Sequence, residues 1–396
     1  MDLNTGIYWI WFSGFPFLKL RARNELIEAL GGPEGIFNAD EKKLSSFRGI
    51  NSEMARIICS TGLDKAEQTV EECSKQKIDI ITLNDPQYPF RLKNIYSPPS
   101  VLYVKGKMPD IDDSAVVAVI GTRKASQYGL RMGKRLAFEI TGCGGVVVSL
   151  LTAGVDHAAA EGALLAGGTC IGVLGTSHEL EHSRISDEVA EYGALVSEYP
   201  PGTVQSRAFF RDRNRIAAGL SLGAVVVEAP EKSGTRFFVS DALEQGKDIY
   251  AVPGNADSAN SKGTLELLKM GAKPVATGWD VISEYAGIYP ELRYSDDKIP
   301  EKIIGSESDD AEDSTEEKKT DAQSISDAEW IKKIRALNDE QKALIFAVEN
   351  GASRIDEIIE KSGFSAPKVL SNITILEIRG IIIRDLSGNI KLKKHF

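Results

Sequence analysis

The sequence predicts an α/β protein whose centre is a doubly wound parallel sheet. Three observations lead to this class: continuous apolar runs recur between residues 115 and 277, helix-like segments separate them, and several runs end in glycine-rich or polar turns. Strands that are apolar throughout, rather than at alternate positions, are typical of a sheet that helices cover on both faces.

Length and composition indicate a globular protein of two or three domains. The chain has 396 residues, of which 42% are hydrophobic and 26% charged. Its four cysteines form no CxxC pair, so we expect buried, reduced thiols and no metal site. The apolar run at residues 6–18 has no basic leader and no small-residue cleavage site, so we expect a cytoplasmic protein without a membrane span.

The first 80 residues have a helical pattern. Apolar side chains fall on one side of a helix over residues 18–30, a glycine pair follows, and shorter helices fit beyond it. Residues 47–58 resemble half of a helix-hairpin-helix in which Asn51 replaces the second glycine. We therefore expect a small helical domain (SAM-like or helix-hairpin-helix-like) at residues 1–80, with packing favoured over DNA clamping.

The predicted core covers residues 81–290. It opens with a proline-rich bridge that ends in a short strand, VLYVKG, at residues 101–106. Helices fit between the later strands, for example at residues 127–141 and 156–168. The sequence predicts these strands at 115–121, 146–151, 170–175, 194–199, 224–229, 248–254 and 274–277.

Two further segments follow the core. The net charge of −10 owes much to an acidic run at residues 306–329, which is nearly free of large apolar residues and is predicted as part of a solvated linker at 291–335. Residues 336–396 fit three helices and then two short strands around a glycine turn, which is the outline of a winged helix.

In a doubly wound sheet, ligands bind beyond the carboxyl ends of the strands. The turn after the first core strand carries Gly121, Thr122, Arg123 and Lys124, and Ser126 is placed to cap the next helix. A helix N-terminus beside cationic side chains attracts anions. The same residues also suit an ordinary tight turn.

A cluster of arginines precedes the strand at 224–229. Arg207, Arg211, Arg213 and Arg215 lie within nine residues that contain one acid, Asp212. A surplus of arginine favours a bidentate grip on phosphate groups, with base stacking as an addition. A solvated charged face is the alternative interpretation.

The remaining turns offer a further phosphate-binding candidate and no recognisable catalytic set. Ser233, Gly234 and Thr235 form a turn that places Arg236 at another helix N-terminus. Asp156 is expected to act as a helix cap or buried structural acid. Paired carboxylates, a nucleophile elbow and a P-loop are not found in these turns, so the sequence predicts a protein that is not an enzyme and needs no cofactor.

Five motifs in chain order resemble the DNA-processing protein A family (DprA, also called Smf). They are IGTRKASQYG, SLLTAGVDHAAAEGAL, FFRDRNRIAAGLS, VVEAPEKSGT and AVPGN. The resemblance covers about residues 5–285 and implies an extended Rossmann-like domain that binds single-stranded DNA without sequence preference. It also implies a homodimer that loads the RecA recombinase onto incoming DNA in natural transformation, displacing or working with single-strand-binding protein.

The resemblance also implies a set of contact residues. The family's GSR arginine falls on Arg123, its RNR motif on residues 213–215 and its SGS turn on residues 233–235. The residues expected to bind DNA are Gly121, Thr122, Arg123, Lys124, Arg211, Arg213, Asn214, Arg215, Ser233, Gly234, Thr235 and Arg236.

The chain departs from the family pattern at four places. The usual serine-glycine is Ser149-Leu150, the helix histidine is Ala160, the usual Thr-Ala is Phe238-Val239, and a later G-x-N reads Gly263-Thr264-Leu265. The first change matters most, because a Cβ in place of glycine blocks close approach to the backbone.

Two alternative functions fit parts of the sequence. Rossmann-like ribohydrolases cleave nucleotides through a PGGxGTxxE signature, but VPGNADS and SGTRFFVSD lack its glutamate. A winged-helix regulator is the other alternative. Its recognition helix, at residues 365–380, has few cations and suits protein contact better than the major groove.

Overall fold

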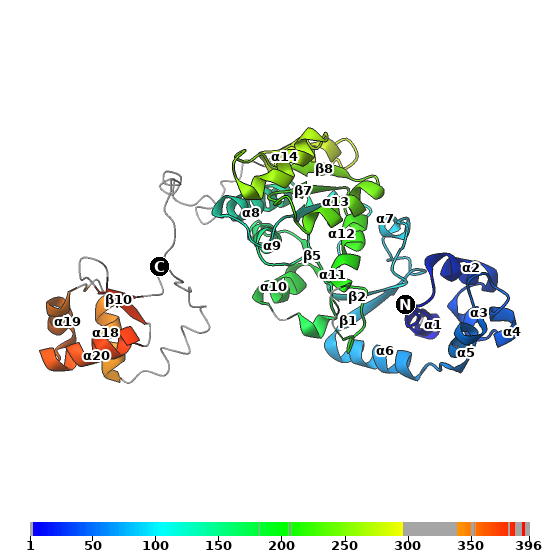
Figure 1. Ribbon diagram of the computed structural model, residues 1–396, viewed down its shortest axis with the longest axis horizontal. Coiled ribbons are helices and arrows are strands. Elements are labelled where there is room, and N and C mark those ends of the chain that lie inside the picture. The colour runs from blue at the N-terminus through cyan, green and yellow to red at the C-terminus, as the bar shows by residue number, and fades with distance from the viewer. Residues whose placement is uncertain are drawn as a thin grey trace. The chain divides into compact units, whose positions relative to one another are not determined.

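The computed structural model describes residues 3–295, apart from 182, 205 and 207, and then 339–349, 352, 354–378, 381–384 and 390–392. The chain divides into two compact units, Met1–Ala311 and Glu312–Phe396 (Figure 1). Arg207 and the predicted linker from residue 296 onward lie outside the described residues. Within the described segments, no helix combines the length and apolar character that crossing a membrane requires.

The first unit begins with six helices around an apolar core that includes Phe12 and Leu26. Gly31 ends the second helix in the left-handed region, with φ 73°. Asn51 caps the fifth, because its side chain accepts a hydrogen bond from the Met54 amide at 2.8 Å. The helices are α1 (Leu3–Ser13), α2 (Leu20–Leu30), α3 (Pro33–Phe37), α4 (Glu41–Leu44), α5 (Ser52–Ser60) and α6 (Asp64–Gln76).

A nine-stranded sheet forms the centre of this unit, with strand order β1-β2-β6-β5-β4-β3-β7-β8-β9. The seven strands from β3 to β9 pair in parallel, as predicted, whereas β2 pairs antiparallel with both β1 and β6. The strands are β1 (Ile78–Thr82), β2 (Val101–Gly106), β3 (Val116–Ile120), β4 (Val146–Ser149), β5 (Cys170–Val173), β6 (Ala194–Ser197), β7 (Gly223–Val226), β8 (Asp248–Ala251) and β9 (Lys273–Pro274).

β1 was not among the predicted strands, and it crosses the expected domain boundary at residue 80. The prediction of a wholly parallel sheet is therefore wrong at one edge. The positions of the domain boundaries remain a prediction.

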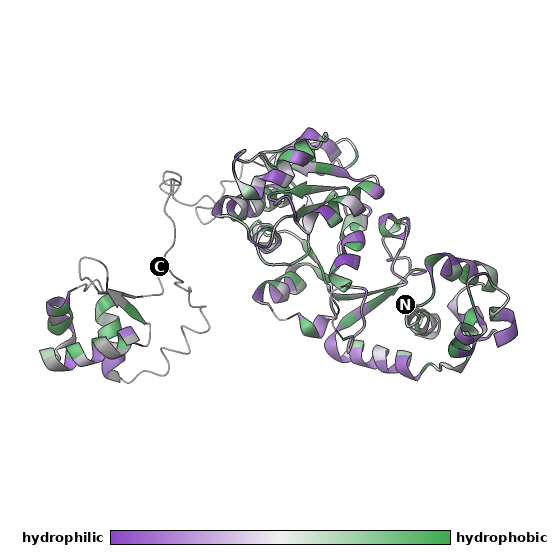
Figure 2. Cartoon of the chain, viewed as in Figure 1, coloured by the Kyte–Doolittle hydropathy of each residue, from purple (hydrophilic) through white to green (hydrophobic). Residues whose placement is uncertain are grey.

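Helices pack on both faces of the sheet, and the two faces have separate apolar clusters. Val116 and Ala118 of β3 point into one cluster, with α7, α12 and α13, while Val117 and Val119 point into the other, with α8, α9, α10 and α15. Figure 2 shows hydrophobic residues concentrated in the central strands. The helices are α7 (Phe90–Lys93), α8 (Gln127–Gly142), α9 (Val155–Leu165), α10 (Arg184–Tyr192), α11 (Phe209–Asp212), α12 (Asn214–Leu220), α13 (Thr235–Glu244), α14 (Lys262–Lys269) and α15 (Gly278–Ile282).

None of the four cysteines forms a disulfide, and three of them, Cys73, Cys143 and Cys170, are buried. The expectation of burial is wrong for Cys59, which is exposed near the end of α5.

The second unit has its own apolar core, which includes Leu344, Ile358 and Ile373. Its described elements are α18 (Asp339–Glu349), α19 (Ile355–Ser362), α20 (Ala366–Ile378), β10 (Ile382–Arg384) and β11 (Ile390–Leu392). The two strands pair antiparallel.

Candidate functional site

A cavity of about 590 Å³ opens beyond the carboxyl ends of the central strands. β3 pairs with β4 on one side and with β7 on the other, so the strand order reverses direction there. Such a switch point is where open α/β sheets hold ligands. The loops after β3, β4, β7 and β8 line this first cavity, together with α11 and the starts of α12 and α13.

The turn after β3 supplies all four of its predicted residues. Gly121, Thr122, Arg123 and Lys124 line the first cavity, and the two cationic side chains are exposed. Thr122 is buried and positions the turn, because its hydroxyl accepts a hydrogen bond from the Lys124 amide at 3.2 Å.

The N-terminus of α8 does not offer the open anion site that the sequence predicts. The Glu228 carboxylate, 2% exposed, lies there instead. It accepts hydrogen bonds from the Ser126 amide at 2.9 Å and the Ser126 hydroxyl at 2.5 Å. Ser126 does cap α8 as expected, by accepting from the Gly129 amide at 3.1 Å. Because a buried carboxylate holds this position, the cationic groups that this turn presents to the cavity are the side chains of Arg123 and Lys124.

The turn after β4 places Asp156 beneath the first cavity. Its carboxylate is 2% exposed and accepts hydrogen bonds from the Gly121 amide at 3.1 Å and from the Thr152 hydroxyl. Burial raises the pKa of Asp156 to about 6, although the Thr152 hydrogen bond and the charge of Arg213 limit the rise. The expectation of a buried structural acid is confirmed.

The arginine cluster divides between two sides of α12. Arg211 is exposed at the first cavity, and its guanidinium lies 4.4 Å from the centre of the Phe237 ring. Arg213 and Asn214 also line this cavity but are buried, at 4% and 6% exposed. Arg213 donates to the Val173 carbonyl at 3.0 Å, and burial lowers its pKa to about 10.

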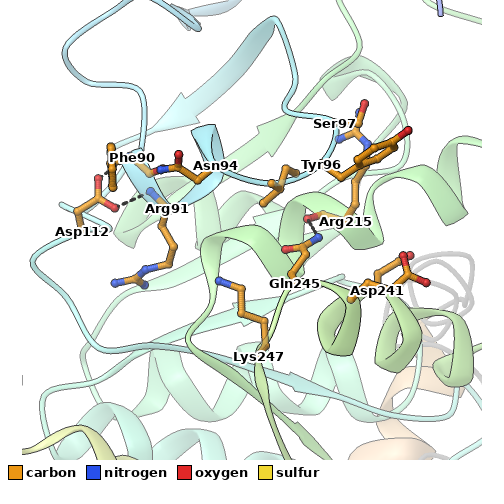
Figure 3. A pocket seen from close by; sticks show the side chains of 12 residues that line it. Phe90, Arg91, Asn94, Tyr96, Ser97, Asp112, Arg215, Asp241, Gln245 and Lys247 are labelled. Atoms are coloured by element: carbon orange, nitrogen blue, oxygen red, sulfur yellow. Dashed lines mark hydrogen bonds between the residues drawn. The ribbon is translucent and has the colours of Figure 1, made fainter. Parts of the chain in front are cut away.

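Arg215 does not reach the first cavity. Its guanidinium pairs with both carboxylate oxygens of Glu198, at 2.7 and 2.6 Å, and its side chain is 22% exposed. It lines a second cavity instead, where Gln245 donates to its backbone carbonyl (Figure 3). The expectation that Arg213 and Arg215 act together on one rim is wrong, because residues two apart on a helix face different directions.

The turn after β7 brings Ser233, Gly234 and Thr235 to the first cavity at the start of α13. The Ser233 hydroxyl accepts from the Thr235 amide at 3.2 Å, and the space around Gly234 is open, which permits close approach to the backbone. Arg236 is exposed but does not line the cavity. Its guanidinium donates to the Glu231 carbonyl at 3.2 Å, so its assignment to the same site is wrong.

Aromatic rings and one further cation complete the site, and the sequence analysis did not select them. Phe210 lies between two guanidiniums, 6.0 Å from that of Arg123 and 5.3 Å from that of Arg213. Phe237 and Lys232 are exposed where they line the cavity. In the sequence, the Phe-Phe pairs beside the arginines and after the Ser-Gly-Thr turn could have indicated these aromatic rings.

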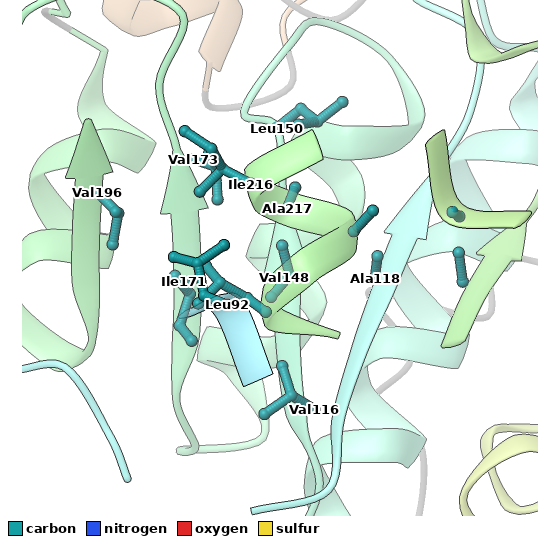
Figure 4. Packing of buried hydrophobic residues seen from close by; sticks show 14 of the residues in the cluster. Leu92, Val116, Ala118, Val148, Leu150, Ile171, Val173, Val196, Ile216 and Ala217 are labelled. Carbon is teal, nitrogen blue, oxygen red and sulfur yellow. The ribbon is translucent and has the colours of Figure 1, made fainter. Parts of the chain in front are cut away.

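The family departures Leu150 and Phe238 line the cavity without filling it. Both line it and are buried, at 9% and 1% exposed, and both belong to the apolar cluster of that face. Leu150 lies next to Ile216 at the end of this cluster (Figure 4). They give the cavity an apolar floor beneath a cationic rim.

The charge of the rim is positive. Arg123, Lys124, Arg211 and Lys232 all line the cavity, and no described carboxylate lies within ion-pair distance of any of them. The fold and this cavity define a doubly wound α/β protein of the Rossmann-like type, with a cavity at the switch point of its sheet.

The chain belongs to the DNA recombination-mediator protein A family, whose sequence profile matches residues 79–286. It is 37% identical to the DNA processing protein DprA of Bacillus subtilis (strain 168) over 214 residues, which are 53% of this chain and 72% of that protein. It is 36% identical to the DNA processing protein DprA of Streptococcus pneumoniae over 218 residues, which are 53% and 75% of the two chains.

A solved structure supports the same assignment. The X-ray structure of DNA processing protein A from Streptococcus pneumoniae superposes with a TM-score of 0.62 at 29% identity. The match covers 72% of this chain and 99% of that one.

Proposed function

We propose that this chain is a non-catalytic protein that binds single-stranded DNA at the first cavity. The observation that carries the proposal is the pairing of cations with aromatic rings around one cavity mouth. Arg123, Lys124 and Arg211 would contact phosphates, and the rings of Phe210 and Phe237 would stack on bases. Unpaired strands are commonly bound by this combination, which tolerates any base sequence.

The proposed contact set differs from the predicted one. Ser233, Gly234 and Thr235 would provide backbone and hydroxyl contacts, and Lys232 would add a cation. Gly121 and Thr122 would hold their turn in place, because their amides donate to Asp156 and to the Glu228 carbonyl. Arg213 and Asn214 would position the wall of the cavity from beneath it, since both are buried. Arg215 and Arg236 are excluded from direct contact at this site.

Membership of a recombination-mediator family supports a cellular role. We propose that the protein acts in the cytoplasm during DNA uptake and recombination, in natural transformation. There a homodimer would load the RecA recombinase onto incoming single strands, alongside single-strand-binding protein.

We also propose identities for the flanking parts. Three helices followed by an antiparallel hairpin, α18 to β11, fit a winged helix. The helices α1 to α6 fit a SAM-like or helix-hairpin-helix-like packing domain, in which Gly49, with φ 87°, and Asn51 form the turn before α5.

The test is the salt dependence of binding to a single-stranded oligonucleotide, followed by fluorescence anisotropy. The double variant Arg123→Ala with Lys124→Ala removes two phosphate contacts. Its affinity should fall, and its slope against log salt should be shallower by about 1.4, at about 0.7 per contact.

Arg236→Ala is the matched control, because Arg236 is exposed near the cavity without lining it. It should keep the affinity and the slope of the wild type. The proposal fails if the double variant binds as the wild type does, or if duplex DNA of equal length binds as tightly as the single strand.

A further inference from the structure

A second cavity, of about 680 Å³, lies on the same face of the sheet as α12 and α13. Its wall comes from the segment Phe90–Ser97, from Arg215 at the start of α12, and from the segment Asp241–Lys247 at the end of α13. α13 thus begins at the first cavity and ends at the second. At 1.5 Å per residue, its 10 residues separate the two by about 15 Å.

One end of the second cavity is cationic. The Arg91 guanidinium is held by neutral acceptors: the Leu220 carbonyl at 3.1 Å, the Ser114 carbonyl at 3.3 Å and the Tyr289 hydroxyl at 2.7 Å. Lys247 extends into the cavity near it (Figure 3). Over the part of the chain that is described, neither side chain has a carboxylate within ion-pair distance.

The environment of Lys247 indicates an excess of positive charge. Burial and the neighbouring charge of Arg91 lower the pKa of Lys247 to about 8. The Asp112 carboxylate also lines the cavity, but it is directed to the Phe90 and Arg91 amides, from which it accepts hydrogen bonds at 2.6 and 2.9 Å, and it is not among the charges that shift the pKa of Lys247. An anion bound at this end would relieve the repulsion between the two cations.

The rest of the cavity has a different character. The Tyr96 ring is 87% exposed at its mouth, and the Phe90 ring is 69% exposed. The Asp241 carboxylate lies at the end away from Arg91 (Figure 3), and the Glu244 carboxylate also lines the cavity. The cavity therefore offers in turn an anion-binding end, an aromatic surface and a pair of hydrogen-bond acceptors.

We propose that the second cavity binds a nucleoside phosphate. The phosphate lies between Arg91 and Lys247, the base stacks on Tyr96, and an amino group on the base donates to Asp241 or Glu244. A free nucleotide and one nucleotide of a strand share this chemistry. The second cavity shares no lining residue with the first, so the proposal does not require strand binding there.

The test is equilibrium dialysis, which measures the binding of radiolabelled deoxyadenosine monophosphate to the full-length protein. Two variants probe the site, Lys247→Gln and Tyr96→Ala, neither of which removes a hydrogen bond found among the described residues. Loss of the charged partner should weaken binding about tenfold in Lys247→Gln. Loss of stacking should weaken it about fivefold or more in Tyr96→Ala.

Lys232→Gln, at the rim of the first cavity, is the control and should bind the nucleotide as the wild type does. Raising the pH from 7 to 9 should weaken binding to the wild type but not to Lys247→Gln. Over that range Lys247, whose pKa is about 8, loses its proton; the other charged groups that line the cavity are Arg91, Asp112, Arg215, Asp241 and Glu244.

Measuring the binding of a single-stranded oligonucleotide shows whether the ligand is a free nucleotide or one nucleotide of a strand. If Lys247→Gln and Tyr96→Ala weaken oligonucleotide binding as well, the ligand is a nucleotide of the strand; if not, it is a free nucleotide. The proposal is overturned if both variants bind the monophosphate normally, if deoxyadenosine binds as tightly as its monophosphate, or if only Lys232→Gln loses binding. If variants of Arg123 and Lys124 bind the oligonucleotide as tightly as the wild type does, that result contradicts only the function proposed for the first cavity.

Discussion

Two buried carboxylates, Glu228 and Asp156, lie directly beneath the cationic rim of the first cavity. Glu228 satisfies the amide end of α8, and Asp156 accepts from the Gly121 amide. The backbone donors of these turns are therefore used inside the protein, and the affinity of the rim for anions depends on its exposed side chains. The charge state of Asp156 then adjusts the potential at that rim.

The titration of Asp156 gives a prediction about stability. Its folded pKa is about 6, whereas an aspartate in an unfolded chain has a pKa of about 3.9. Between these two values the folded state binds a proton that the unfolded chain has released, so stability from this group is lost as the pH rises through that window. Asp156→Asn removes the titration.

The free energy of unfolding of Asp156→Asn, relative to the wild type, should therefore increase between pH 4.5 and pH 7. Urea unfolding at several pH values measures it. The exposed Asp257→Asn is the control and should show no such trend. A difference for Asp156→Asn that does not change with pH would contradict the raised pKa.

At the scale of the element, α12 links the two cavities. Arg213, just before its first residue, faces the first cavity, and Arg215 fixes the helix to Glu198 beyond the end of β6. About a quarter of each partner of this ion pair is exposed, at 22% and 25%, so solvent screens it only in part.

Glu198→Gln should lower the free energy of unfolding by about 1–2 kcal/mol, because it leaves a half-buried guanidinium without its charged partner. The double variant with Arg215→Gln should lose less than the sum of the two single variants, which a double-mutant cycle in urea measures. Glu72→Gln, in the exposed pair with Lys75, should change stability by less than about 0.5 kcal/mol. Additive losses at residues 198 and 215 would show that the pair is not coupled.

The sequence was sufficient to predict the elements of the sheet but not all of its edges. Most residues of the parallel strands β3 to β8 are apolar and buried, and these strands end in recognisable turns, so local pattern was enough; β9, Lys273–Pro274, is short and exposed. β1 depends on antiparallel pairing with β2, about 20 residues later, as in Ile80 with Tyr103. Its short run IDIIT gives no strong local signal of that partner.

Prediction of the site succeeded for loops and failed for side-chain direction. The turns that hold Arg123, Arg211 and Ser233 all reach the first cavity, because the carboxyl ends of parallel strands meet there. The separation of Arg213 from Arg215 follows from helix geometry and could have been predicted from the sequence. The position of Glu228 at the start of α8 could not have been predicted, since it depends on contact between residues about 100 positions apart.

At the scale of the molecule, an acidic chain with a net charge of −10 has a positive rim at one cavity. In residues 312–396 the Asp and Glu residues about balance the Lys and Arg residues, so the second unit adds no net positive charge. α20, the proposed recognition helix, contains one cation, Lys368, which pairs with Glu340 at 2.7 Å. Such a helix is poorly suited to contact DNA phosphates.

Removal of residues 312–396 should therefore leave the affinity for single-stranded DNA within about twofold of that of the full chain, because the proposed contacts all lie in the first unit. Fluorescence anisotropy of the fragment Met1–Ala311 measures this. Circular dichroism confirms that the fragment is folded. A tenfold or greater loss would show that the second unit contributes to binding.

β2 belongs to two apolar cores at once. Leu102 and Val104 point into the cluster beside α12, whereas Val101 and Tyr103 point into the core of the N-terminal helices. One short strand therefore couples the unfolding of those helices to the unfolding of the sheet. On heating, the N-terminal helices and the α/β sheet region should unfold together in a single cooperative transition, although they are consecutive segments of the chain.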